Sequence, residues 1–287
     1  MPLPCLMYGG HAMIGIVMKA GFYQFKPVFG KKEQNITTVS DALKGVDAEL
    51  MVLPEFFATG YQFISMDEVA RLAEIIPGGR TTDALVGLSR KHGLYIVGGL
   101  PEREGEHFYN SAVITGPDGF IGVYRKTHLF FEEKLWFTPG NTGFKVFYTD
   151  IGAIGIMICF DWYFPESMRT LALQGAQIIA HPANLVLPHC PAAIPIRCLE
   201  NKVYAVTANR TGTEQRKEGP PLTFIGMSQI VGPDSTIAAR APESGASIMI
   251  VDTDLEKSLN KAINPYNDLF KDRRPEMYQI LGRTEDS

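Results

Sequence analysis

Three residues whose side chains can perform acyl transfer each follow an apolar segment that is typical of a buried strand. Glu55 comes after the run 50–53 and a proline, Lys126 after 120–124, and Cys159 closes the run 153–159. A carboxylate can take a proton, an ammonium group can stabilise developing negative charge, and a thiol can attack a carbonyl carbon. Because α/β folds gather their ligands at the carboxyl ends of strands, we expect the three side chains to meet.

Taken singly, each of these residues has a plainer interpretation. Glu55 is then the first solvated residue of a loop, Lys126 is a surface lysine, and Cys159 is a core residue, since free cysteine is often buried. Two local features favour chemistry instead. A pair of phenylalanines follows Glu55 at once. Cys159 lies at a turn before a helix that has Pro165 near its start, where backbone N–H groups can receive negative charge.

The composition is that of an ordinary globular protein. The chain has 287 residues, of which 45% are hydrophobic and 20% charged, and a formal net charge of -4. A slightly acidic chain without basic clusters is a poor partner for nucleic acid or for an anionic membrane. The four cysteines do not form a disulfide framework in a chain of this length, so we expect a reducing, cytoplasmic location.

Strand and helix patterns alternate along the chain. Helices are expected over 66–76, 82–92, 165–174 and 195–202, and Asn35 is a candidate cap for an earlier one. Strands are expected over 20–25, 50–53, 94–100, 109–115, 120–124, 144–148, 153–159, 177–180, 203–207, 223–231, 237–240 and 247–251. Strands joined by both helices and hairpins predict an α/β fold with mixed sheets and helices outside.

We find no linker, repeat or low-complexity segment, so a single main domain over 18–263 is expected. An N-terminal extension, 1–17, precedes it. The extension is apolar and has no Lys or Arg, unlike a secretory signal, and Met18 is an alternative start of the natural chain. The C-terminal tail, 264–287, is charged and aromatic, and it is suited to pack on its own domain or on a partner subunit.

The stretches around the three residues resemble the nitrilase superfamily, the carbon–nitrogen hydrolases. The matching stretches are LPEFFATGY (53–61), YRKTHLF and the glutamates after it (124–133), MICFDWYFPE (157–166) and GAQIIAHPAN (175–184). The resemblance extends over nearly all of the chain from Met18. The amino-acid sequence of these stretches is most similar to that of short thermophilic aliphatic nitrilases and related amidases. The one departure is the N-terminal extension.

This resemblance implies a role for each residue. Glu55 would be the general base, Lys126 the cation at the oxyanion, and Cys159 the nucleophile. Glu133 would be a second glutamate that holds substrate and triad in place, with Glu132 as the alternative. The resemblance also implies a four-layer αββα sandwich of two mixed sheets packed face to face, and a homodimer or higher homo-oligomer whose tail crosses to the neighbouring subunit. We expect no cofactor or metal.

The same chemistry requires a dry pocket. Ordinary pKa values are about 4.3 for glutamate and about 8.5 for cysteine, so moving the thiol proton costs roughly 5–6 kcal/mol. Burial of Glu55 would raise its pKa, and Lys126 near the sulfur would lower the pKa of Cys159. The residues expected to line the pocket and bind substrate are Tyr61, Phe131, Phe160, Trp162 and Asn184.

Several substrates fit this chemistry. We expect a small aliphatic amide, which would be hydrolysed through a thioester to ammonia and a carboxylic acid. A small nitrile, converted through a thioimidate, is the alternative substrate. Two more distant alternatives are an N-carbamoyl compound as the substrate and a binding protein without activity. A metal site at His181, His189 and Cys190 is set aside because no zinc-type spacing recurs elsewhere.

Overall fold

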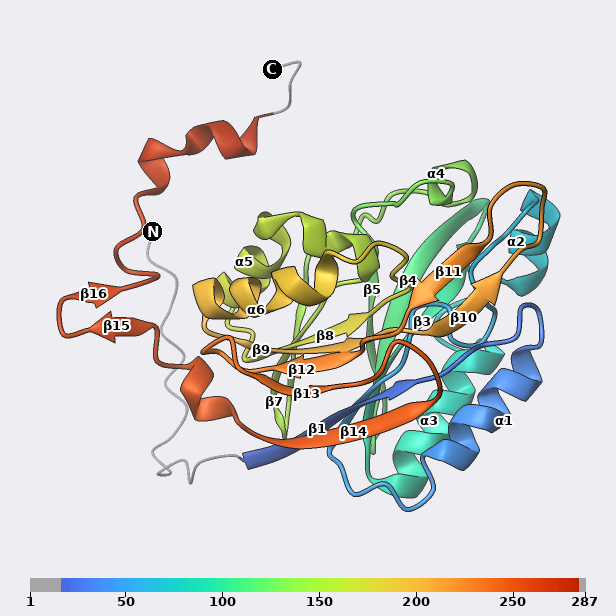
Figure 1. Ribbon diagram of the computed structural model, residues 1–287, viewed down its shortest axis with the longest axis horizontal. Helices are drawn as coiled ribbons and strands as arrows, with labels where there is room; N and C mark the ends of the chain where they lie inside the picture. The colour runs from blue at the N-terminus through green and yellow to red at the C-terminus, as the bar shows by residue number, and fades with distance from the viewer. Residues whose placement is uncertain (1–16, 284–287) are drawn as a thin grey trace.

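Two mixed β-sheets form the centre of the computed structural model, which describes residues 17–283 (Figure 1). The first sheet contains, in spatial order, β14 (Ser247–Asp254), β1 (Val17–Gln24), β2 (Leu50–Val52), β3 (Tyr95–Glu104), β4 (His107–Gly116) and β5 (Gly119–Arg125). The second contains β13 (Ile237–Arg240), β12 (Gln229–Val231), β9 (Tyr204–Ala208), β8 (Ile178–Pro182), β7 (Gly152–Ile156) and β6 (Val146–Thr149). In each sheet three adjacent strands are parallel and the others pair antiparallel: β1, β2 and β3 in the first, β7, β8 and β9 in the second.

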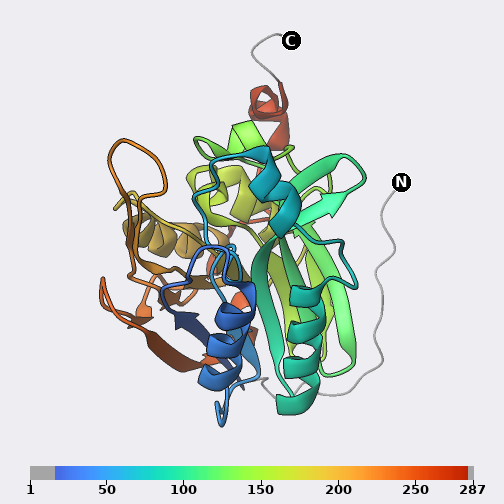
Figure 2. The same cartoon turned by 90° about the vertical axis from the view of Figure 1, so that its right-hand side faces the viewer.

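Helices cover the outer face of each sheet, as Figures 1 and 2 show. The first sheet carries α1 (Lys32–Ala42) and α3 (Arg80–His92), and α2 (Met66–Leu72) lies near one end of it. The second sheet carries α5 (Pro165–Leu173) and α6 (Cys190–Asn201). The predicted α/β class and the four-layer arrangement of two mixed sheets with helices outside are confirmed.

Strand β2 shows how the alternation of side chains builds these layers. Leu50 and Val52 point into the core between the two sheets. Met51 and the following Leu53 point the other way, into a second core beneath α1 and α3. Successive side chains of a strand face opposite sides of the sheet, so a strand covered on both sides is apolar throughout. This alternation is the reason why residues 50–53 form a continuous apolar run.

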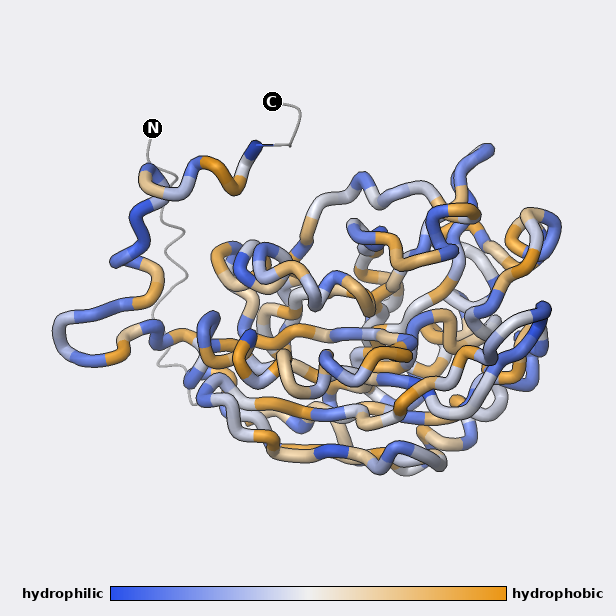
Figure 3. The backbone as a smooth tube through the Cα atoms, turned by 45° about the horizontal axis from the view of Figure 1, so that its top comes forward, coloured by the Kyte–Doolittle hydropathy of each residue, from blue (hydrophilic) through white to orange (hydrophobic). Residues whose placement is uncertain are grey.

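Several further elements lie at the edges of the sandwich. They include the short helix α4 (Glu133–Trp136), the hairpin of β10 (Thr211–Glu214) and β11 (Leu222–Ile225), and the C-terminal strands β15 (Ala262–Asn264) and β16 (Asn267–Asp268). Figures 1 and 3 show the C-terminal segment running away from the sheets, with hydrophilic and hydrophobic stretches along it. Contact of the tail with a second subunit stays a prediction. Residues 1–16 of the N-terminal extension and residues 284–287 of the tail lie outside the described residues. Among the described helices, none has the length and apolar character needed to cross a bilayer.

Some predicted boundaries were wrong for identifiable reasons. Asn35 lies inside α1 rather than at its cap, because its side chain bonds the backbone of Val28 and Ala58 instead. The predicted strand 223–231 is two strands, since the chain bends at Gly226 and Met227, which both have positive φ. Helix α2 ends at Leu72, before the predicted 76. Helix α6 begins at Cys190, five residues before the predicted start, and contains Pro195.

The segment after β5 returns close to the end of that strand at Gly140. The Gly140 N–H donates to the Lys126 carbonyl over 2.8 Å. A Cβ at this position would lie 2.1 Å from the Arg125 carbonyl oxygen and 2.7 Å from that of Lys126. Only glycine permits this approach, which fixes the backbone that carries Lys126.

Replacing Gly140 with alanine is therefore expected to lower the free energy of unfolding by about 1–3 kcal/mol, the usual cost of overpacking. The matched control is Gly87→Ala in α3, where an added Cβ meets no atom within 4 Å. There alanine is expected to stabilise the protein by about 0.5–1 kcal/mol. Urea denaturation measures both changes, and equal stability of the two variants would contradict the packing argument.

Candidate active site

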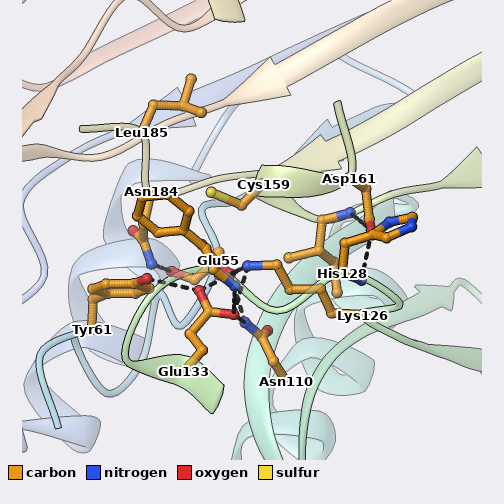
Figure 4. Close-up of polar contacts among 12 residues, drawn as sticks. Glu55, Tyr61, Asn110, Lys126, His128, Glu133, Cys159, Asp161, Asn184 and Leu185 are labelled. Carbon is orange, nitrogen blue, oxygen red and sulfur yellow. Dashed lines mark hydrogen bonds and ion pairs between the residues drawn. The ribbon is translucent and has the colours of Figure 1, made fainter. Parts of the chain in front are cut away.

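The ends of four strands bring the candidate residues together. Glu55 is the third residue after β2 and Lys126 directly follows β5, so both belong to the first sheet. Cys159 is the third residue after β7 and Asn184 the second after β8, so both belong to the second sheet. In Figure 4 Cys159 lies between Asn184 and Asp161, next to the pair formed by Lys126 and Glu55.

The ammonium group of Lys126 is fully buried between two carboxylates. Its Nζ lies 2.7 Å from Glu55 Oε1 and 2.8 Å from each carboxylate oxygen of Glu133. Asn110 of β4 donates from Nδ2 to Glu55 over 2.6 Å and to Glu133 over 3.3 Å. The Tyr61 hydroxyl donates to Glu133 over 2.7 Å. Glu132 instead pairs with Lys217 at the surface.

The backbone at Glu55 is held by both sheets. The Glu55 backbone packs closely against Gly99 of β3 in the first sheet, where an added Cβ would lie 2.6 Å from Glu55 Cα. From the second sheet, Asn184 Nδ2 donates to the Glu55 carbonyl over 2.9 Å. Glu55 Oε1 is occupied by Lys126 and Asn110, whereas Oε2 has no hydrogen-bond partner within residues 17–283. One carboxylate oxygen is thus left to take a proton.

Cys159 begins a 3₁₀ helix, Cys159–Tyr163, with a φ of 42°. A side chain at such a φ is strained, and this sharp turn is the elbow expected between strand and helix. The Cys159 carbonyl lies 2.9 Å from Nε2 of buried His181, whose Nδ1 lies 3.0 Å from the Thr207 hydroxyl oxygen. Burial lowers the pKa of His181 to about 4, so its ring is neutral.

Electrostatics in the cluster follow from burial and from the two carboxylates. Burial raises the pKa of Glu55, and Glu133 adds to that rise while Lys126 opposes it. Burial works against the charged form of Lys126, but the two carboxylates outweigh it and raise the lysine pKa. Burial and the Glu55 charge raise the pKa of Cys159 well above its ordinary value, although Lys126 and the Asn184 backbone N–H lower it.

The raised pKa of Cys159 corrects the expectation that Lys126 would bring it below its ordinary value. Lys126 does act on the Cys159 thiol in the predicted direction, but burial and the neighbouring carboxylates outweigh it, so the pKa of Cys159 is raised rather than lowered. The resting sulfur is a thiol at neutral pH. A base must therefore remove its proton during attack.

A small cavity of about 20 Å³ opens beside the sulfur. A space of that size is close to the volume that holds a single water molecule. Its lining residues are Phe130, Cys159, Phe160, Trp162, Asn184, Leu185, Val186 and Leu187. Of the predicted pocket residues, Phe160, Trp162 and Asn184 lie here, and Tyr61 lies at Glu133. Phe131 is 65% exposed and the neighbouring Phe130 takes the place at the cavity.

Sequence reasoning missed Asn110, Phe130 and the segment 185–187. Asn110 had a visible signal, because it is an amide inside an otherwise apolar strand pattern. The residues that were considered and set aside as a metal site lie in different surroundings: His181 bonds the Cys159 carbonyl, and Cys190 is buried at the start of α6.

Comparison with known proteins identifies the family of the chain. The model of the carbon–nitrogen hydrolase family matches residues 19–259. A nitrilase of Pyrococcus abyssi is 48% identical over 265 residues, which are 91% of this chain and 99% of the relative. A carbon–nitrogen hydrolase from Helicobacter pylori G27 is similar in structure, with a TM-score of 0.84, 26% identity, and coverage of 93% of this chain and 99% of that one.

A mutant amidase from Nesterenkonia sp. AN1 has a TM-score of 0.76 at 25% identity, covering 95% of this chain and 99% of that one. Its structure has the acetamide moiety of fluoroacetamide added covalently to the active-site cysteine. The family match spans most of the chain, and the nitrilase relative matches along nearly its whole length. The chain therefore belongs to the carbon–nitrogen hydrolase family, the nitrilase superfamily, and is a cysteine-dependent hydrolase.

Proposed function

We propose that the protein hydrolyses the carbon–nitrogen bond of a small aliphatic amide through a thioester on Cys159. The observation that carries this proposal is the buried cluster of Glu55, Lys126 and Glu133 beside a cysteine at a strained turn. Glu55 takes the thiol proton as the sulfur attacks the carbonyl carbon. It then gives that proton to the departing nitrogen, and ammonia leaves. Water activated by Glu55 finally releases the carboxylic acid.

The proton transfer leaves the net charge of the cluster unchanged. Before attack, the Glu55 and Glu133 carboxylates and the Lys126 ammonium group sum to one negative charge. After attack the proton is on Glu55 and the negative charge has moved to the substrate oxygen. Lys126 can then donate to that oxygen the hydrogen bond that it gave to Glu55. A fixed cation in a dry site stabilises such a charge far better than water-exposed groups do.

Small acyl groups are favoured by the dimensions and chemistry of the cavity. Its walls are phenylalanine, tryptophan, leucine and valine side chains, with Asn184 and Cys159 as the polar members. An aliphatic group loses water contact there without leaving a buried charge unpaired. The amidase with a modified active-site cysteine supports the same assignment for Cys159.

A small nitrile is the second candidate. The nitrilase of Pyrococcus abyssi supports it, with 48% identity along almost its whole length. In that reaction the first adduct is a thioimidate, which adds water and loses ammonia to reach the same thioester. Glu55, Lys126 and Cys159 would keep their roles, so the two substrates differ only before the thioester forms.

Cys159→Ala is expected to abolish turnover of both substrate classes, because no thioester can form. Its unfolding temperature should stay near that of the wild type. Cys198→Ala in α6 is the matched control, since it removes another buried thiol, and its activity should persist. Ammonia release and thermal unfolding measure these outcomes. Turnover by Cys159→Ala would overturn the mechanism.

Matched amides and nitriles that share one acyl chain decide between the two substrate classes. Ammonia release should be faster from a short aliphatic amide than from the corresponding nitrile. Mass spectrometry of the quenched enzyme should find the same acyl mass on Cys159 from both. A nitrile turned over tenfold faster than its amide would establish the second candidate instead.

The pH profile tests the role of Glu133. The general base must be ionised, so kcat/KM falls as the pH drops through the pKa of Glu55. Burial raises this pKa and the Glu133 charge raises it further. Glu133→Gln removes that charge, lowers the pKa of Glu55, and should move the acidic limb of the profile to lower pH.

Glu132→Gln is the matched control for this measurement. It makes the same change one residue away, where the side chain pairs with Lys217 and not with Lys126. Its acidic limb should stay at the position found for the wild type. An equal shift in both variants, or a shift of Glu133→Gln to higher pH, would contradict the assignment.

A further inference from the structure

A third buried carboxylate of the site, Asp161, lies behind Cys159 and has no part in the proposed proton transfers. Each of its oxygens accepts two hydrogen bonds. Oδ2 accepts from the Ile158 N–H over 2.9 Å and from the Tyr124 hydroxyl over 2.7 Å. Oδ1 accepts from the His128 N–H over 3.1 Å and lies 2.8 Å from His128 Nδ1. Asp161 is therefore fully satisfied, in contrast to Glu55 with its unpartnered oxygen.

The partners of Asp161 lie on both sides of the active site. Ile158 directly precedes Cys159 and comes from the second sheet. Tyr124 and His128 are two residues before and two residues after Lys126, on the first sheet and the loop that follows it. Figure 4 shows Asp161 and His128 on one side of Cys159, with Lys126 below them. One side chain thus connects the segment that carries the sulfur with the segment that carries the ammonium group.

Cys159 needs such a connection because of its backbone. Its φ of 42° is unfavourable for a residue with a Cβ, and such a conformation persists only where its surroundings fix it. The Ile158 N–H bonded to Asp161 lies immediately before this turn, and the His181 ring bonds the Cys159 carbonyl immediately after the Cα. The two bonds hold the cysteine backbone from either side.

We propose that Asp161 is a positioning residue that sets the place of the Cys159 sulfur relative to Lys126. This rests on the proposed function, in which Cys159 is the nucleophile. Asp161 is not itself among the residues that line the cavity, and it acts through the backbone at Ile158 and through the β5 end.

An amide cannot replace this carboxylate. Backbone N–H groups bond both oxygens, Ile158 on one and His128 on the other, and a backbone N–H group cannot become an acceptor. In either orientation, the NH₂ group of an asparagine would face one of these two donors. Asp161→Asn therefore preserves the shape of the side chain while it breaks one side of the connection.

The test uses iodoacetamide as a probe of the Cys159 sulfur, with the modified residue identified by mass spectrometry. In Asp161→Asn we expect the alkylation rate and kcat each to fall about 100-fold, as for a reacting group displaced by about 1 Å. KM should change little, because the cavity walls remain. Leu88→Ala in α3 is the control, since it destabilises the fold far from the site. Its alkylation rate should equal that of the wild type.

Tyr124→Phe provides a milder change, because it removes one donor and leaves both backbone N–H groups in place. We expect about a fivefold fall in the alkylation rate, the equivalent of one hydrogen bond. This variant carries the test if Asp161→Asn does not fold. Rates that equal those of Leu88→Ala in the variants that fold would overturn the positioning role. The proposed function fails separately, through turnover by Cys159→Ala.

Discussion

The burial of one ammonium group, that of Lys126, is the constraint on which the rest of the site depends. A charge removed from water is costly unless opposite charges and hydrogen bonds surround it. Two carboxylates supply the opposite charge, at 2.7 Å and 2.8 Å. Those carboxylates in turn receive hydrogen bonds from Asn110 and Tyr61. Removal of Lys126 would leave two buried carboxylates without their cation, and removal of a hydrogen-bond donor would leave a buried carboxylate less well satisfied.

The same constraint determines the behaviour of the thiol. Lys126 lowers the pKa of Cys159, but burial and the two carboxylates outweigh it, so Cys159 stays protonated in the resting state. The pocket therefore contains a thiol and a carboxylate with raised pKa values. In the proposed mechanism, the thiol proton moves as the substrate oxygen takes over a hydrogen bond from Lys126. A sulfur that ionises only during attack is less prone to chance oxidation than a resting thiolate.

The sequence predicted much of this structure, because short-range patterns determine strand placement. The apolar runs before Glu55, Lys126 and Cys159 indicated buried strands, and the resemblance to a known family indicated how those strands assemble. Asn35 shows where prediction failed, since its side chain bonds Val28 and Ala58 rather than a helix end. Phe131 and Phe130 show a second limit: the φ of 47° at Phe131 decides which ring faces the cavity, and no local pattern encodes it. The direction of the Cys159 pKa shift was mispredicted because burial of the thiol and the nearby carboxylates outweigh Lys126.

The division of the site between two sheets has a consequence for how the protein folds. Glu55 and Lys126 come from the first sheet, whereas Cys159 and Asn184 come from the second. A partly folded chain in which each sheet has formed but the two have not docked holds Glu55 and Lys126 apart from the Cys159 sulfur. Recovery of activity during refolding would thus report the docking step itself, and it would lag behind any spectroscopic signal from the separate sheets. Neither sheet can carry out the proposed reaction before the two sheets dock.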